Sequence, residues 1–404
     1  MLWLYNIAIQ FYSLIVRIFS LFNTKAALFV DGRKHLFEKI AAKIDPVQKH
    51  IWFHFASLGE FEQGRPVLEK LKKEYPSKGI VVTFFSPSGY EIRKNYALAD
   101  GIFYLPLDTS RNAKKLIAAI NPELAIFTKY EYWHHYFKAL HKNGIPLFII
   151  SGIFRPNQIY FKPYGSFYRN ILKKVTHFFV QNEESKKLLN GVNISSVSIS
   201  GDTRFDRVAE NADHPKSIEL IRSFCAGTPT LIAGSTWPAD EQLLAHLIGA
   251  NKGWKFIIAP HEIHKSHIDD IQNLIPNSLK YAELDGNNSP QVLIIDNIGL
   301  LSSIYQYGKI AYIGGGFGVG IHNTLEAAAF GIPVIFGPNY DKFQEAKDLI
   351  QLGAAVSINS QDELNQAFLT LTESGYAGLI AKKYVLENKG STDQIFNRIS
   401  GLFS

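Results

Sequence analysis

Cysteine and charge are both scarce in this chain of 404 residues. Its one cysteine, Cys225, cannot close a disulfide within the chain, and the same count excludes zinc sites built from paired cysteines. Charged residues make up 19% of the sequence and hydrophobic residues 46%, which excludes a disordered chain. The formal net charge of +6 is spread without the Lys/Arg blocks that mark a nucleic-acid groove, so we expect no nucleic-acid partner.

Long apolar runs are absent except at the N-terminus. Residues 1–22 are apolar apart from polar positions at helical spacing, which draw one narrow stripe along a helix: Asn6, Gln10, Ser13, Arg17 and Ser20. On a soluble surface helix the apolar residues cover less than half of the circumference, whereas here they cover most of it. The pattern therefore predicts a helix in contact with lipid, which either spans the membrane or lies on it. A helix buried in the core of the protein stays an alternative. A secretory signal is disfavoured because Arg17 interrupts the apolar stretch.

Basic residues follow this apolar segment directly. They are Lys25, Arg33, Lys34, Lys39 and Lys43. Positive charge beside a membrane helix favours the cytoplasmic side and attracts anionic headgroups. We therefore expect the rest of the chain to lie on the cytoplasmic face of a membrane with an anionic surface.

The remainder of the sequence predicts an α/β protein with two halves. Short β-branched or aromatic runs alternate with helical patterns, which is typical of parallel sheets. The polar stretch 201–216 is interpreted as a linker. We expect a membrane-anchoring helix at 1–22 and two Rossmann-like, doubly wound domains facing a cleft, at 23–205 and 206–404.

Polar side chains follow several predicted strands of the first half. Glu60 comes just after the first strand and Glu131 after the fourth. Since the carboxyl ends of parallel strands meet ligands, both are candidate catalytic acids, with Glu60 as general base. By position alone, an ordinary acid at a helix N-terminus explains Glu60 equally well. The residues expected to line an adjoining sugar or phosphate site, where an acceptor would bind, are Ser86, Ser88, Lys129 and Arg155.

The second half carries a glycine-rich loop and hydroxyls at predicted helix N-termini. Backbone N–H groups there bind phosphate, although Thr236 would also serve as an ordinary helix cap. Glu326 lies one turn into the helix after the glycine loop, where it can accept hydrogen bonds from ribose hydroxyls. The expected nucleotide-binding residues are Gly234, Ser235, Thr236, Pro260, His261, Gly315, Gly316, Asn323 and Glu326. No metal site is expected, because Lys265 stands where a zinc-protease motif needs histidine.

Four segments together resemble the 3-deoxy-D-manno-octulosonic acid (Kdo) transferases: Ser57–Glu60, Thr83–Glu91, Gly234–Thr236 and His322–Glu326. These glycosyltransferases of type B fold (GT-B) move Kdo from CMP-Kdo to a lipid A precursor, lipid IVA, at the cytoplasmic face of the inner membrane. The resemblance implies that Glu60 is the catalytic base and that no cofactor is required. It also implies that CMP is held by Ser235, Thr236, Asn323 and Glu326.

Two segments depart from the pattern of that family. Many members read Glu-x-Glu-x-Trp-Pro-Asn where this chain has Lys129 to His135, so only Glu131 and Trp133 match. An Arg-His pair follows the proline where this chain has His261 and Glu262. Alternatives from other classes are a sugar-nucleotide 2-epimerase, a transferase with another nucleotide-sugar donor, and a non-catalytic lipid A-binding protein.

Overall fold

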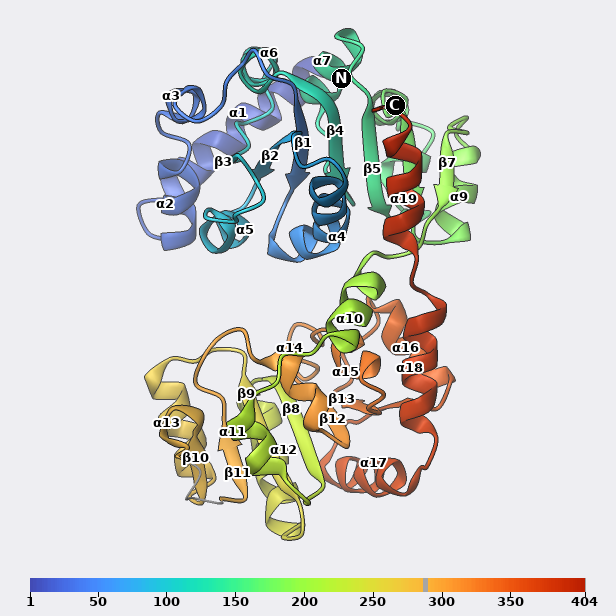
Figure 1. The fold of residues 1–404 in the computed structure, drawn as a ribbon. Coiled ribbons are helices and arrows are strands. Elements are labelled where there is room, and N and C mark those ends of the chain that lie inside the picture. The colour runs from blue at the N-terminus through green and yellow to red at the C-terminus, as the bar shows by residue number, and fades with distance from the viewer. Residues whose placement is uncertain (286–289, 404) are drawn as a thin grey trace. The chain divides into compact units, whose positions relative to one another are not determined.

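The chain folds into two compact units. In the computed structural model, which describes residues 1–285 and 290–403, the first unit comprises Met1–Asp206 with Lys389–Ser404 and the second comprises Arg207–Asn388 (Figure 1). Each unit is built on its own parallel sheet.

The first sheet has the strand order β3-β2-β1-β4-β5-β6-β7, and every neighbouring pair is parallel. Its strands are β1 (His50–Phe55), β2 (Gly79–Phe84), β3 (Gly101–Tyr104), β4 (Pro122–Thr128), β5 (Leu147–Gly152), β6 (His177–Val180) and β7 (Val197–Ile199). Almost every residue of these strands is buried, because helices cover both faces of the sheet.

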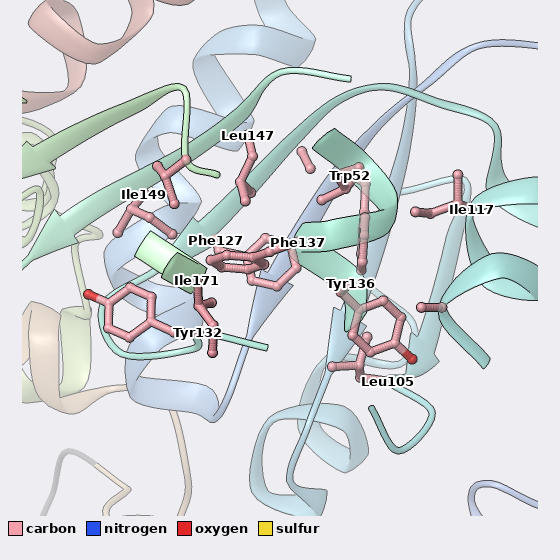
Figure 2. Close-up of a cluster of buried hydrophobic side chains, with 14 of the residues drawn as sticks. Trp52, Leu105, Ile117, Phe127, Tyr132, Tyr136, Phe137, Leu147, Ile149 and Ile171 are labelled. Atoms are coloured by element: carbon pink, nitrogen blue, oxygen red, sulfur yellow. The ribbon is translucent and has the colours of Figure 1, made fainter. Parts of the chain in front are cut away.

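Side chains alternate between the two faces along each strand. On β1, Trp52 points into one core while Ile51 and Phe53 point into the other. The first core is shown in Figure 2, where Phe127 of β4 meets Phe137. It is covered by α3 (Leu36–Ala41), α6 (Ser110–Ile120), α7 (His134–Lys142), α8 (Ser166–Leu172) and α9 (Glu183–Asn190). The opposite core lies under α4 (Leu58–Glu74), α5 (Pro87–Arg93) and α19 (Ser391–Ser400).

The second sheet has the order β10-β11-β9-β8-β12-β13-β14, again parallel throughout. Its strands are β8 (Thr230–Thr236), β9 (Lys255–Pro260), β10 (Ser278–Lys280), β11 (Val292–Ile294), β12 (Ile310–Ile313), β13 (Val334–Phe336) and β14 (Ala355–Ser357). One core is covered by α12 (Pro238–Ala250), α13 (Lys265–Leu274) and α17 (Gln361–Glu373). The remaining helices of this unit are α11 (Glu219–Cys225), α14 (Leu301–Ile304), α15 (Leu325–Ala329), α16 (Gln344–Gln351) and α18 (Ala377–Glu387).

The predicted fold class is confirmed, with two local corrections. The stretch 201–216, expected to be an irregular linker, contains α10 (Arg204–Asp213). The C-terminal helix α19, which the sequence placed with the second half, belongs to the first unit. Its Ile395 and Ile399 are fully buried in the core under α4, and its Asp393 pairs with Lys70.

The N-terminal helix α1 (Leu2–Phe19) has no buried residue, so it is not a core helix. Its contacts with the rest of the first unit include two polar ones: the Tyr5 hydroxyl donates to Asp108 over 2.5 Å, and Asn6 Oδ1 lies 2.7 Å from His135 Nε2. Its large apolar side chains, including Phe11 at 62% exposed, are left uncovered. By length and composition this helix could cross a membrane.

Arg33 follows α2 (Thr24–Asp31) and is used inside the fold. Its guanidinium donates to the carbonyl oxygens of Phe29, Leu105 and Phe85 and lies 3.5 Å from the Phe29 ring centroid. Burial lowers the pKa of Arg33 to about 10. Arg33 therefore ties the segment after α2 to the ends of β2 and β3, whereas the sequence placed it among the surface cations. The lysines of that group are exposed: Lys25, Lys34, Lys39 and Lys43.

Candidate active site

Both candidate sites lie where the strand order reverses. In the first sheet, successive strands run outward in opposite directions from the β1–β4 pair, and in the second from the β8–β12 pair. Ligands of doubly wound sheets bind outside the carboxyl ends of the strands at such switch points. Glu60 follows β1 and Glu131 follows β4, while Ser235 ends β8 and Gly315 follows β12. The topology thus brings each predicted group to a binding edge.

Glu60 occupies the first turn of α4. Its Oε2 accepts the backbone N–H of Ala56 at 2.6 Å. Burial, and next the negative charge of Glu131, raise the pKa of Glu60 to about 7, against the opposing effects of the Ala56 hydrogen bond and of Lys129. A carboxylate with a pKa near neutrality is suited to accept a proton at physiological pH.

Glu131 is held by two rings. Its Oε2 lies 3.2 Å from Nε2 of His54 and accepts the indole N–H of Trp133 at 3.0 Å. The other ring nitrogen of His54 lies 2.9 Å from Oγ1 of Thr83, which also accepts the indole N–H of Trp52 at 2.8 Å. His54 is completely buried, so this network fixes Glu131 across the ends of β1, β2 and β4.

His54 was not among the predicted site residues, although the sequence carries a signal for it. It lies between Phe53 and Phe55 in a strand that is otherwise apolar after its first residue, His50, and a buried imidazole needs polar partners. Its partners come from β2 and from the segment after β4, which the local sequence around His54 does not reveal.

The serines expected to bind the acceptor lie beside the Glu60 loop. Ser86 precedes α5, and its Oγ lies 2.8 Å from Oγ of Ser88. A Cβ on Gly89 would approach the carbonyl carbon of Ser57 to 3.1 Å, so glycine allows α5 to pack closely against the residue that precedes α4. The two hydroxyls are therefore next to the loop that carries Glu60.

The two predicted cations differ in their surroundings. Lys129 adopts a left-handed backbone with φ of 56°, which is unusual for a side chain of this size and is a feature of constrained sites. Its positive charge is near enough to oppose the rise in the pKa of Glu60 and, after Arg204, to help lower the pKa of Asp202. Arg155 is exposed, with Nη1 3.4 Å from the Tyr130 hydroxyl. Lys129 thus belongs to the carboxylate cluster, and Arg155 lies at its rim.

In the second unit, two of the predicted groups are already engaged. The Thr236 hydroxyl donates to Oε1 of buried Glu241 at 2.9 Å, and the N–H of Gly315 donates to Oδ2 of buried Asp240 at 2.9 Å. Thr236 is therefore not the helix cap that the sequence offered beside phosphate binding, because its hydroxyl bonds a side-chain carboxylate and Trp237 is the N-cap residue of α12. Ser235 is half-buried and has a left-handed φ of 55°.

The glycine loop after β12 approaches β8 closely. A Cβ on Gly314 would lie 2.3 Å from the Ser235 carbonyl oxygen, and one on Gly316 would lie 2.6 Å from Cα of Gly337. Side chains at either position would push these backbones apart. Gly234 is equally constrained, because its Cβ would lie 2.1 Å from the Tyr305 hydroxyl.

Asn323 and Glu326 lie together, as their spacing predicted. Asn323 Nδ2 donates to Oε1 of Glu326 at 3.1 Å, and its Oδ1 accepts the N–H of Leu325 at 3.1 Å. Both side chains are half-buried. The pair can offer carboxylate and amide oxygens to hydroxyl groups of a ligand.

A stack of three rings adjoins this loop. His261 follows Pro260 at the end of β9. Its ring stacks on Trp237 with 4.8 Å between ring centroids and on His322 with 4.4 Å. The Trp237 indole N–H donates to Nε2 of His322 at 3.3 Å. Burial, and next His261, lower the pKa of His322 to about 4, so this ring is neutral at physiological pH. Of the three, only His261 was among the predicted nucleotide-binding residues.

The histidine-rich segment after β9 is tied to α12. His267 Nε2 lies 2.9 Å from Glu241 Oε2 and its Nδ1 lies 2.8 Å from the Glu262 carbonyl oxygen. These partners outweigh burial and raise the pKa of His267. Within residues 1–285 and 290–403, no three His, Cys, Asp or Glu side chains form a group able to hold a metal ion.

Comparison with known proteins finds similarity to one family of enzymes. The family described as 3-deoxy-D-manno-octulosonic-acid transferase (Kdo transferase) matches residues 32–207. A Kdo transferase of Chlamydophila psittaci is 28% identical over 323 residues, covering 76% of this chain and 74% of the relative. One from Aquifex aeolicus is 27% identical over 324 residues, covering 78% and 83%. The chain is thus similar to Kdo transferases over about three quarters of its length. It is therefore a glycosyltransferase, as the resemblance implied.

Solved structures support the fold assignment. The UDP-GlcNAc 2-epimerase of Neisseria meningitidis superposes with a TM-score of 0.61 and 15% identity, covering 87% of this chain and all of that one. The MurG protein of Acinetobacter baumannii superposes with a TM-score of 0.55 and 14% identity, covering 87% and 99%. At these identities the likeness concerns the GT-B-like architecture alone.

Proposed function

We propose that this protein transfers Kdo from CMP-Kdo to a hydroxyl group of a lipid A precursor, lipid IVA, with inversion at the anomeric carbon. Similarity to the Kdo transferases supports the donor and the acceptor. The observation that carries the mechanism is Glu60, a partly buried carboxylate with a pKa of about 7 at the switch point of the first sheet.

In this mechanism, ionised Glu60 accepts the proton of the acceptor hydroxyl as its oxygen attacks the anomeric carbon. The bond from that carbon to the phosphate oxygen breaks, and CMP leaves from the opposite face with the bonding electrons. Glu131 acts on Glu60 through its charge, which helps to keep the base poised near neutrality. The network of His54, Thr83 and Trp133 keeps Glu131 in position.

The donor is proposed to bind at the second switch point. Half-buried Ser235, the backbone around Gly316 and the Asn323–Glu326 pair are the groups offered to CMP there. The hydroxyl of Thr236 is assigned to shaping the loop, because its proton is donated to Glu241. Backbone N–H groups and a serine hydroxyl can stabilise a departing phosphate by hydrogen bonding.

A lipid acceptor suits the position of α1. Tyr12 of this helix stacks on Phe85 at 6.2 Å between ring centroids, Phe85 lies 5.0 Å from Trp133, and Trp133 donates to Glu131. The apolar helix thus adjoins the edge of the sheet that carries the carboxylates. We propose that its uncovered face lies in the cytoplasmic leaflet of the inner membrane, so that the acceptor's acyl chains stay in lipid while its sugar reaches Glu60.

The proposal is tested by incubating purified protein with labelled CMP-Kdo and lipid IVA in mixed micelles. Product carrying Kdo, with release of CMP, is expected. A parallel reaction with UDP-GlcNAc, analysed for the 2-epimer, tests the epimerase alternative. Absence of transfer by a folded preparation that binds CMP-Kdo would refute the acceptor assignment, and absence of CMP-Kdo binding would refute the donor assignment.

A further inference from the structure

A cavity of about 590 Å³ opens between α1, α2, α3 and the start of α6. Its apolar lining includes Phe29, Val30 and Phe37, and its cations include Arg17, Lys34 and Lys115. None of the residues proposed above for acceptor, donor or catalysis lines it. The cavity is therefore lined by a different set of residues from the transfer site.

The cations around this cavity have few negative partners. Within the described part of the chain, Arg17 and Lys115 form no ion pair, and Lys115 lies 5.5 Å from the ring centroid of Phe37. Lys34 pairs with Asp31 at 2.7 Å, but both side chains are more than half exposed, so the pair is weak. The lining acid, Glu38, lies 3.0 Å from His35. Positive charge beside the apolar side chains of the lining complements a phosphodiester that is attached to an apolar tail.

Helix α1 relates this cavity to the bilayer. Ser13, Val16 and Arg17 contribute to the lining, while the neighbouring Leu14 and Ile18 are 54% and 52% exposed on the uncovered face. The polar stripe of α1 includes Ser13 and Arg17, which line the cavity. A lipid whose tails lie against the uncovered face of α1 would place its headgroup beside these polar residues. The opening is thus placed to receive a headgroup from the same leaflet.

We propose that this cavity binds the phosphate-bearing headgroup of an anionic phospholipid of the bilayer, fixing the orientation of the enzyme on the membrane. The inference deepens the proposed membrane association and rests on it. The lipid is bound as a site ligand, and no bond is made or broken.

The experiment compares binding of the full-length protein to vesicles of phosphatidylcholine with binding to vesicles that also contain phosphatidylglycerol. The cavity variant replaces Arg17, Lys34 and Lys115 by Ala. The control variant removes three exposed charges elsewhere on the first unit by replacing Lys73, Lys142 and Lys187 by Ala. Equal charge loss in both variants separates the cavity from net charge.

The wild type and the control variant are expected to prefer the anionic vesicles, and the cavity variant to lose that preference by about tenfold or more. Binding to phosphatidylcholine should be equal in all three, because the apolar face of α1 is unchanged. Equal loss of preference in both variants, or no loss in the cavity variant, would overturn the proposal.

A second substitution tests occupancy without changing charge. Leu107 lines the cavity and is partly exposed, so Leu107→Trp should fill part of it. The folded variant, checked by its melting temperature, is expected to lose the anionic preference, and retention would overturn the proposal. If the wild type binds neither vesicle, membrane association itself fails. In that case, a calorimetric titration with dissolved short-chain phosphatidylglycerol tests binding to the cavity without a membrane. Absence of binding refutes the proposal.

Discussion

Glu60→Gln separates proton transfer from helix capping because the two roles predict opposite effects on stability. The pKa of Glu60 is raised from 4.5 to about 7 in the folded chain, so the folded state binds this proton more tightly than the unfolded state does. The stabilisation of the folded chain by protonated Glu60 is fully present at a pH below the pKa of this group in the unfolded chain. It is lost as the pH rises through the folded pKa, since the buried carboxylate must then ionise.

The size of this loss follows from the shift. At 1.36 kcal/mol per pKa unit, ionisation of Glu60 costs the folded state about 3 kcal/mol above neutral pH. Glutamine carries no charge, and its amide oxygen can still accept the N–H of Ala56. Glu60→Gln should therefore match the wild type near pH 4 and melt higher near pH 8, by about 6 to 12 °C for a unit of this size.

Turnover should change in the opposite direction. A base that cannot accept a proton lowers the rate by about 10² to 10⁴ while leaving donor affinity nearly unchanged. The wild-type rate should rise with pH and level off above about pH 7, as Glu60 ionises, and the variant should lack this acid limb.

The assay measures Kdo transfer, CMP affinity and melting temperature on one preparation at each pH. Glu74→Gln is the matched control, since this exposed acid lies at the other end of the same helix. If Glu60→Gln keeps normal turnover and is less stable than the wild type at both pH values, the carboxylate is a helix cap and the mechanism is wrong.

Further substitutions test the remaining assignments. Glu131→Gln should move the acid limb of the rate profile to lower pH, because the charge of Glu131 raises the pKa of Glu60; an unmoved limb would contradict their coupling. Thr236→Val should lower stability by about 1 to 3 kcal/mol by leaving buried Glu241 short of a donor, with CMP affinity by calorimetry little changed. Glu326→Ala should weaken CMP binding by about 1 to 3 kcal/mol in a folded protein, and unchanged affinity would remove it from the donor site. Polar substitution of the uncovered face of α1 should release the protein from membranes without lowering its melting temperature, and continued sedimentation with membranes would refute the anchor. The side chains to replace by Gln are Trp3, Phe11 and Phe19.

The sheets were predictable because buried parallel strands are nearly continuous apolar runs. The exception is β10, Ser278–Lys280, which is short, lies at an edge and is only half-buried, so its sequence carries no apolar signal. The helix α10 was missed for another reason. Phe205, Val208 and Ala209 are buried at helical spacing, but the polar residues around them mask that period.

The place of α19 could not be predicted from neighbouring sequence. Its Ile395 and Ile399 are apolar at helical spacing, which predicts a helix but not the sheet against which it packs. The partner, α4, lies at the opposite end of the chain. Only the tertiary structure joins segments so far apart, and a boundary drawn along the sequence assigns such a helix to the wrong domain.

In the candidate site, too, the sequence pattern predicts the position of a residue but not its tertiary partners. Parallel topology requires that residues after β1 and β4 reach one edge, so the meeting of Glu60 and Glu131 followed from the strand pattern. The state of each group depends instead on partners from elsewhere in the chain. Thr236 is engaged because Glu241 lies one turn into the next helix, and Glu131 is held because His54 faces it from inside the sheet. A motif therefore locates chemistry at a strand end, whereas the buried residues behind it decide which of its atoms can act on a substrate.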